Sequence, residues 1–259
     1  MNREYFIVAP PYRANSAGVR VLYRLWDELR AAGERCNIIS FTWKIPKDSI
    51  AIYPEVFPGN MLKADNVVRY VLNKPGLLGG DKVYHEDEKV FVYAEPFVKS
   101  VQNDIAGMLH MPSVDLDLFR NKFYVDRPLT CAYIGKGKLD KSLLPPIEMV
   151  GITKENPDNR EALVELLNKS KVLYNFDPCT IIPCEAALCG CPTVDLSGNH
   201  DEYAQCELGT LGTTTIDTQF SIEQARLETY KVRDHFVGLE KVFQKQLKSF
   251  IEITQNMNK

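Results

Sequence analysis

One stretch, residues 171–197, constrains the fold more than any other part of the chain. It reads KVLYNFDPCTIIPCEAALCGCPTVDLS. The apolar run at 171–176 is typical of a buried strand, and 192–196 is typical of a second one. Residues 181–189 between them are apolar enough for a buried helix, and Gly190 suits the position after its last turn. A strand, a helix and a strand in so few residues favour a parallel sheet with a right-handed crossover.

Two carboxylates give this unit its candidate chemistry. Asp177 follows the first strand, and Glu185 lies eight positions later on the predicted helix, for which Thr180 is the candidate N-cap. Ligands of open parallel sheets bind beyond the carboxyl ends of the strands, where a carboxylate can accept the paired hydroxyls of a ribose. The alternative is that Asp177 is only a turn residue and Glu185 a solvated helix residue. We favour binding because apolar neighbours leave this helix little polar face.

Composition limits the class of protein. The chain has 259 residues, enough for two domains, with 45% hydrophobic and 25% charged residues and a net charge of -3. That charge argues against a nucleic-acid partner. No apolar run approaches the roughly 20 residues of a membrane span, and the N-terminus lacks the features of a signal peptide. The seven cysteines form no C-x-x-C pair, so we expect reduced thiols in a cytoplasmic protein without a metal site.

The first half of the chain predicts an α/β domain at residues 1–118. Gly18 ends a loop that follows the first strand, where backbone amides could meet a phosphate or a sugar, although a plain loop fits the residues as well. A further helix is expected at 65–73 because apolar residues recur there at helical spacing. The expected strands lie at 5–9, 36–42, 50–56 and 89–95, and the first helix lies at 18–32.

The second half predicts a similar domain at 119–220 and a helical tail at 221–259. Strands are expected at 129–134 and 147–152, and Asn156 to Asn159 should cap a helix at 160–169. The tail should begin at the capping box of Ser221 and break near Gly238.

A Gly-Lys-Gly-Lys turn, residues 135–138, follows the first strand of the second domain. Its glycines allow a ligand close to the backbone, and Lys136 and Lys138 supply positive charge. A basic hairpin turn is the structural alternative.

A family resemblance rests on the pattern acidic-x7-Glu followed by Ala-Ala-x-x-Gly-x-Pro-x-Val. Here the pattern is carried by Asp177, Glu185, Ala186, Ala187, Gly190, Pro192 and Val194. It resembles the nucleotide-sugar site of glycosyltransferases with the two-domain B fold. The family usually has Glu at the first position, so Asp177 departs from it by one methylene. Residues 108–120 are similar to the interdomain hinge of these enzymes, and 53–80 resembles a segment of bacterial rhamnosyl-type transferases that build surface polysaccharides.

The resemblance implies two Rossmann-like domains that face each other across a cleft. It implies retaining transfer of a sugar from a nucleotide-sugar to a glycan or lipid-linked acceptor, with possible peripheral membrane association and without a metal or further cofactor. Lys136, then Lys138, and the helix start at Thr180 would hold the diphosphate. Glu185 with Asp177 would hold the ribose, and the loop at Gly18 would face the donor. The pattern assigns no catalytic base.

Other functions on the same fold stay open. A sugar-nucleotide epimerase, a phosphorylase and a non-catalytic nucleotide-sugar-binding protein could each carry this pattern. A dinucleotide-dependent oxidoreductase is disfavoured, because no G-x-G-x-x-G follows the first strand.

Overall fold

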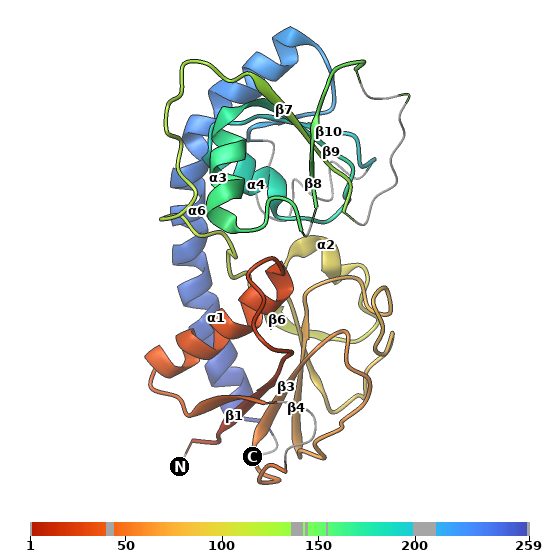
Figure 1. The fold of residues 1–259 in the computed structure, drawn as a ribbon. Helices are drawn as coiled ribbons and strands as arrows, with labels where there is room; N and C mark the ends of the chain where they lie inside the picture. The colour runs from red at the N-terminus through yellow and green to blue at the C-terminus, as the bar shows by residue number, and fades with distance from the viewer. Residues whose placement is uncertain are drawn as a thin grey trace. The chain divides into compact units, whose positions relative to one another are not determined.

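The computed structural model describes residues 2–39, 44–135, 142, 145–153, 155–198 and 211–257. The chain divides into two compact units, Met1–Pro112 with Leu239–Lys259, and Ser113–Gly238 (Figure 1). Each unit contains a parallel sheet, and the chain ends in a long helix. The predicted α/β class with two Rossmann-like parallel sheets and a C-terminal helix is therefore confirmed. The predicted cleft stays a prediction.

The sheet of the first unit has six parallel strands in the order β2-β1-β3-β4-β5-β6. Its central strands are buried along their whole length, which explains why they read as continuous apolar runs. The strands are β1 (Tyr5–Val8), β2 (Cys36–Ile39), β3 (Ile50–Pro54), β4 (Asn66–Val71), β5 (Lys89–Val92) and β6 (Ile105–Met108), and the helices are α1 (Ala17–Ala31) and α2 (Glu95–Val98).

The helix predicted at 65–73 is wrong, because Asn66–Val71 forms strand β4. Val68 pairs with Ile52 of β3, and all six residues of β4 are buried. Spacing of apolar residues cannot separate a short buried strand from a helix, since both faces of the strand are apolar.

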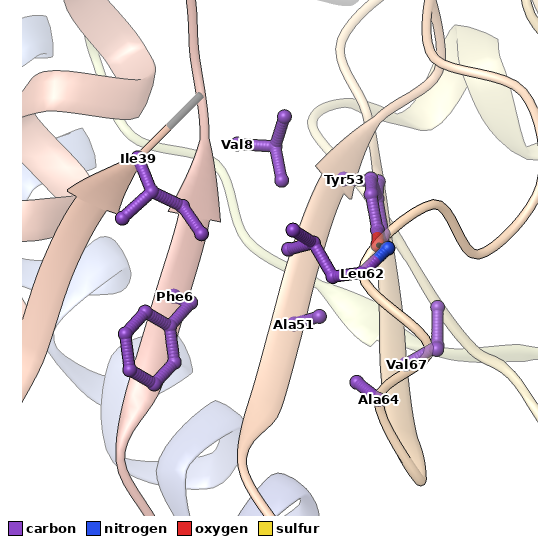
Figure 2. Packing of buried hydrophobic residues seen from close by; sticks show 8 residues of the cluster. All are labelled: Phe6, Val8, Ile39, Ala51, Tyr53, Leu62, Ala64 and Val67. Atoms are coloured by element: carbon purple, nitrogen blue, oxygen red, sulfur yellow. Dashed lines mark hydrogen bonds between the residues drawn. The ribbon is translucent and has the colours of Figure 1, made fainter. Parts of the chain in front are cut away.

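Both faces of this sheet are covered. On one face, residues of β1, β2 and β3 pack with the segment that carries Leu62 and Ala64 (Figure 2). Tyr53 is fixed there because its hydroxyl oxygen accepts a hydrogen bond from Leu62 N at 2.8 Å. On the other face, the ring of Phe250 lies 6.2 Å from Tyr5 and 4.7 Å from Phe91, measured between centroids.

The second unit has a five-stranded parallel sheet in the order β11-β10-β9-β7-β8. The strand-helix-strand unit predicted from residues 171–197 is confirmed as β9-α4-β10. The predicted capping of α3 is also confirmed, since Asn159 Oδ1 accepts from Ala162 N at 2.7 Å. The elements are β7 (Leu129–Tyr133), β8 (Val150–Ile152), α3 (Arg160–Lys169), β9 (Ser170–Asn175), α4 (Ile182–Leu188), β10 (Thr193–Asp195) and β11 (Thr213–Thr214).

The last helix, α6 (Gln219–Gln255), corrects two expectations. It runs unbroken for 37 residues through Gly238, and it starts before Ser221. Thr218 caps the start of α6, because Thr218 Oγ1 accepts a hydrogen bond from Ser221 N at 3.2 Å. A single glycine in a helix costs only about 1 kcal/mol relative to alanine, which is too little to break a helix packed at several points. The chain passes between the two units inside this helix, at Gly238.

Gly190→Ala is expected to lower the free energy of unfolding by about 1–3 kcal/mol. Gly190 has φ +74°, and an added Cβ would lie 2.4 Å from Asn121 Nδ2 and 2.9 Å from Arg127 Nη2. Arg127 donates to the carbonyl of Cys189 at 2.9 Å, so a displaced Arg127 would also leave the end of α4. Urea denaturation measures the change. Gly238→Ala is the control. A Cβ added at Gly238, inside α6, meets no atom within 4 Å, so this variant should raise the free energy of unfolding by about 0.5–1 kcal/mol. Equal behaviour of the two variants would contradict the argument.

Candidate functional site

The carboxyl ends of β7, β9 and β10 form one edge of the sheet in the second unit. These strands are neighbours and run parallel, so their last residues lie side by side. Tyr133, Asn175 and Asp195 are those last residues. The interior of the strands is apolar, whereas this edge is polar, as expected where an open parallel sheet binds a ligand.

Asn175 joins the ends of two strands at this edge. Its Nδ2 donates to the carbonyl of Asp177 at 3.0 Å and to Asp195 Oδ1 at 3.1 Å, and its Oδ1 accepts from Asp177 N at 3.2 Å. Asn175 and Asp195 are both buried, and sequence reasoning assigned neither to the site. The available signal was a polar residue that ends an otherwise apolar strand.

Asp177 is buried and forms a local turn. Its Oδ1 accepts from Cys179 N at 2.9 Å, in the way that an aspartate commonly bonds the backbone two residues on. Its Oδ2 lies against Gly135, where an added Cβ would come within 2.0 Å. Asp195 forms a matching turn, in which its Oδ1 accepts from Ser197 N at 3.1 Å. The described contacts of Asp177 are thus structural, and its binding of a donor stays a prediction.

Glu185 lies in the first turn of α4 and its side chain is 0% exposed. The alternative of a solvated helix residue is therefore wrong. Glu185 Oε1 accepts a hydrogen bond from Arg160 Nη2 at 2.9 Å, and the Arg160 side chain is 16% exposed. The guanidinium of Arg160 lies over the ring of Phe119, 4.7 Å from its centroid. Sequence reasoning missed Arg160 because it is distant from Glu185 in the chain.

Tyr133 interacts with three of the predicted residues, Thr180, Asp177 and Glu185. Burial raises the pKa of its hydroxyl, a hydrogen bond with Thr180 opposes that rise, and the carboxylates of Asp177 and Glu185 add to it. Thr180 precedes the N-cap position of α4, which Ile181 occupies, although Thr180 Oγ1 accepts from Ile182 N at 3.4 Å. The Tyr133 hydroxyl therefore shares a hydrogen bond with Thr180 and lies within the electrostatic reach of Asp177 and Glu185.

Three predicted residues remain, Lys136, Lys138 and Gly18. Lys136 and Lys138 are outside the described residues. Gly18 belongs to the first unit and to the first turn of α1. An added Cβ at Gly18 would make only an ordinary contact, 3.7 Å from Leu72 Cδ1, so packing does not require glycine there. The donor contacts of these three residues stay predictions.

Within the described ranges, no group of three or more His, Cys, Asp or Glu side chains is arranged to hold a metal ion. Nor is any helix in that part of the chain long and apolar enough to cross a membrane. No protein-family model matches the sequence, and no curated protein matches it either.

Proposed function

We propose that the protein is a cytoplasmic glycosyltransferase that uses a nucleotide-sugar donor. It would transfer the sugar, with retention of configuration, to a glycan or lipid-linked acceptor in bacterial surface polysaccharide synthesis. One observation carries the proposal. The two carboxylates of the acidic-x7-Glu pattern, Asp177 and Glu185, are both buried, and both raise the pKa of Tyr133, the last residue of β7, at the carboxyl edge of a parallel sheet, which is the edge that binds nucleotides in open α/β sheets.

In this proposal the protein acts mainly by positioning the donor and by stabilising charge on the leaving diphosphate. The nucleoside half of the donor binds at the edge formed by β7, β9 and β10. Lys136 and Lys138, which follow β7 in the sequence, supply positive charge for the diphosphate. The catalytic base is not assigned.

A thermal-shift panel tests the binding step. The probes are UDP, GDP, ADP and dTDP, alone and as common nucleotide-sugars, with NAD and inorganic pyrophosphate as comparison ligands. A ligand at about 100 times its dissociation constant stabilises the folded state by about 2.7 kcal/mol. For a chain of this size we expect a rise in melting temperature of roughly 5–10 °C with one nucleoside diphosphate and its sugar conjugate. No shift with any nucleotide would contradict the proposal.

Product analysis tests the reaction. The donor found in the panel is incubated with and without oligosaccharide and lipid-linked acceptors, and the products are identified by mass spectrometry and NMR. Nucleoside diphosphate release together with a glycosylated acceptor supports a transferase. A new nucleotide-sugar formed without acceptor would indicate an epimerase, and binding without turnover would indicate a non-catalytic binding protein.

A further inference from the structure

We propose that Arg160 is the residue of this edge that contacts the nucleoside half of the donor, and that Glu185 is the positioning residue that holds it. The inference rests on the proposed function, because it takes a nucleotide as the ligand. It departs from the expectation that the Glu185 carboxylate itself accepts the ribose hydroxyls.

Burial distinguishes the two members of the pair. The side chain of Glu185 is 0% exposed, whereas that of Arg160 is 16% exposed. The pair therefore reaches solvent only through the Arg160 side chain, and the Glu185 side chain is enclosed. A ligand that enters from solvent therefore meets Arg160 before it meets Glu185.

Two neighbours hold the guanidinium of Arg160 in place. Glu185 Oε1 holds Nη2 at 2.9 Å, and the buried ring of Phe119 lies 4.7 Å below the guanidinium carbon. Asn159 fixes the start of α3, of which Arg160 is the first residue. An arginine that is ordered before binding loses less side-chain entropy when a ligand arrives, so this arrangement favours binding.

The local charge indicates which ligand atoms Arg160 contacts. A guanidinium only donates hydrogen bonds, so its ligand must supply acceptor oxygens. Among the described side chains at this edge, the carboxylates of Asp177, Asp195 and Glu185 outnumber the guanidinium of Arg160. These carboxylates would repel a negatively charged ligand group, such as a phosphate, placed beside Arg160. Neutral oxygens, the ribose hydroxyls or the carbonyls of the base, are therefore the better match than phosphate.

Two conservative variants of the full chain separate the roles of the pair. Arg160→Lys keeps the charge beside buried Glu185 but loses the planar fork, and Glu185→Gln keeps the size of the side chain. The probes are the nucleoside diphosphate that binds the parent and inorganic pyrophosphate, each titrated by calorimetry. We expect Arg160→Lys to weaken nucleoside diphosphate binding about tenfold or more and to leave pyrophosphate binding within about twofold. Glu185→Gln should weaken it less, because Arg160 remains.

A double variant and a control complete the experiment. Arg160→Met with Glu185→Gln removes both charges, so no lone charge is buried, and it should bind at least as weakly as Arg160→Lys because methionine donates no hydrogen bond. The control is Glu161→Gln, because Glu161 is the exposed neighbour of Arg160 in α3. This variant should bind nucleoside diphosphate as tightly as the parent.

Several outcomes would overturn the inference. Parent-like binding by Arg160→Lys would do so, as would a larger loss in Glu185→Gln, which would mean that the carboxylate contacts the ribose. An equal loss for pyrophosphate would mean that Arg160 contacts phosphate, and parent-like binding by the double variant would mean that neither member of the pair contacts the ligand. If the parent binds no nucleoside diphosphate, the proposed function fails and this inference fails with it.

Discussion

Arg69→Met is expected to lower the free energy of unfolding by about 3–5 kcal/mol, because it leaves a buried carboxylate without its cation. The side chains of Arg69 and Glu88 are 1% and 8% exposed. Arg69 Nε donates to Glu88 Oε2 at 2.6 Å, and Nη2 donates to Oε1 at 3.0 Å. The guanidinium also donates to the carbonyls of Phe57 and Gly59, each at 2.9 Å. Loss of Arg69 therefore releases the segment at 57–59 as well as the charge of Glu88.

Urea denaturation of matched variants measures this effect. Arg69→Met with Glu88→Leu removes both charges and should recover much of the stability, although the two carbonyls remain without their donor. Arg120→Met is the surface control, since Arg120 and its partner Asp117 are both exposed and such pairs contribute about 0–1 kcal/mol. A loss below about 1 kcal/mol in Arg69→Met would show that the pair does not stabilise the unit.

Arg69 also shows why part of the fold could not be predicted from the sequence. Its strand reads NVVRYV, and the spacing of the apolar residues in this region predicted a helix. The partner that makes an arginine tolerable inside a sheet is Glu88, which lies just before the next strand along the chain. Nothing local in the sequence identifies such a partner. By contrast, β9-α4-β10 was predictable because Asp177, Pro178 and Gly190 mark its turns within the stretch itself.

The candidate site divides in the same way. Asp177, Thr180 and Glu185 come from one short segment, so a local pattern was enough to select them as candidates. Arg160 comes from a different strand-helix connection, and Asn175 looked like part of an apolar strand. Their roles depend on which strands are neighbours, and the order β10-β9-β7-β8 is set by the packing of the whole sheet. A local pattern can therefore locate a site without showing which of its side chains faces a ligand.

The stability of the first unit is expected to depend on pH through Glu55. Its side chain lies just after β3 and is 4% exposed. Burial raises the pKa of this carboxyl from 4.5 to about 7, and a hydrogen bond from Leu72 N at 3.0 Å opposes the rise. In the unfolded chain the carboxyl loses its proton near pH 4.5, whereas in the folded chain it keeps the proton until near pH 7. Folding is therefore favoured most below pH 4.5, and this contribution is lost as the pH rises to 7.

The size of this contribution follows from the shift in pKa. One pKa unit corresponds to 1.36 kcal/mol, so the contribution of Glu55 should fall by about 3 kcal/mol between pH 4.5 and 7.5. Glu55→Gln has no proton to lose at this position. The difference in free energy of unfolding between variant and parent should therefore move in favour of the variant by about that amount over this range. Taking the difference cancels the groups that titrate in both proteins.

Urea denaturation at pH 5, 6, 7 and 8 measures the two curves. Glu86→Gln is the control, because Glu86 is an exposed carboxylate in the same unit and should give a curve parallel to that of the parent. Parallel curves for Glu55→Gln and the parent would mean that Glu55 titrates as it does in the unfolded chain. The buried carboxyl would then have to be stabilised in its charged form by the amide of Leu72, and the first unit would have no pH dependence from this site.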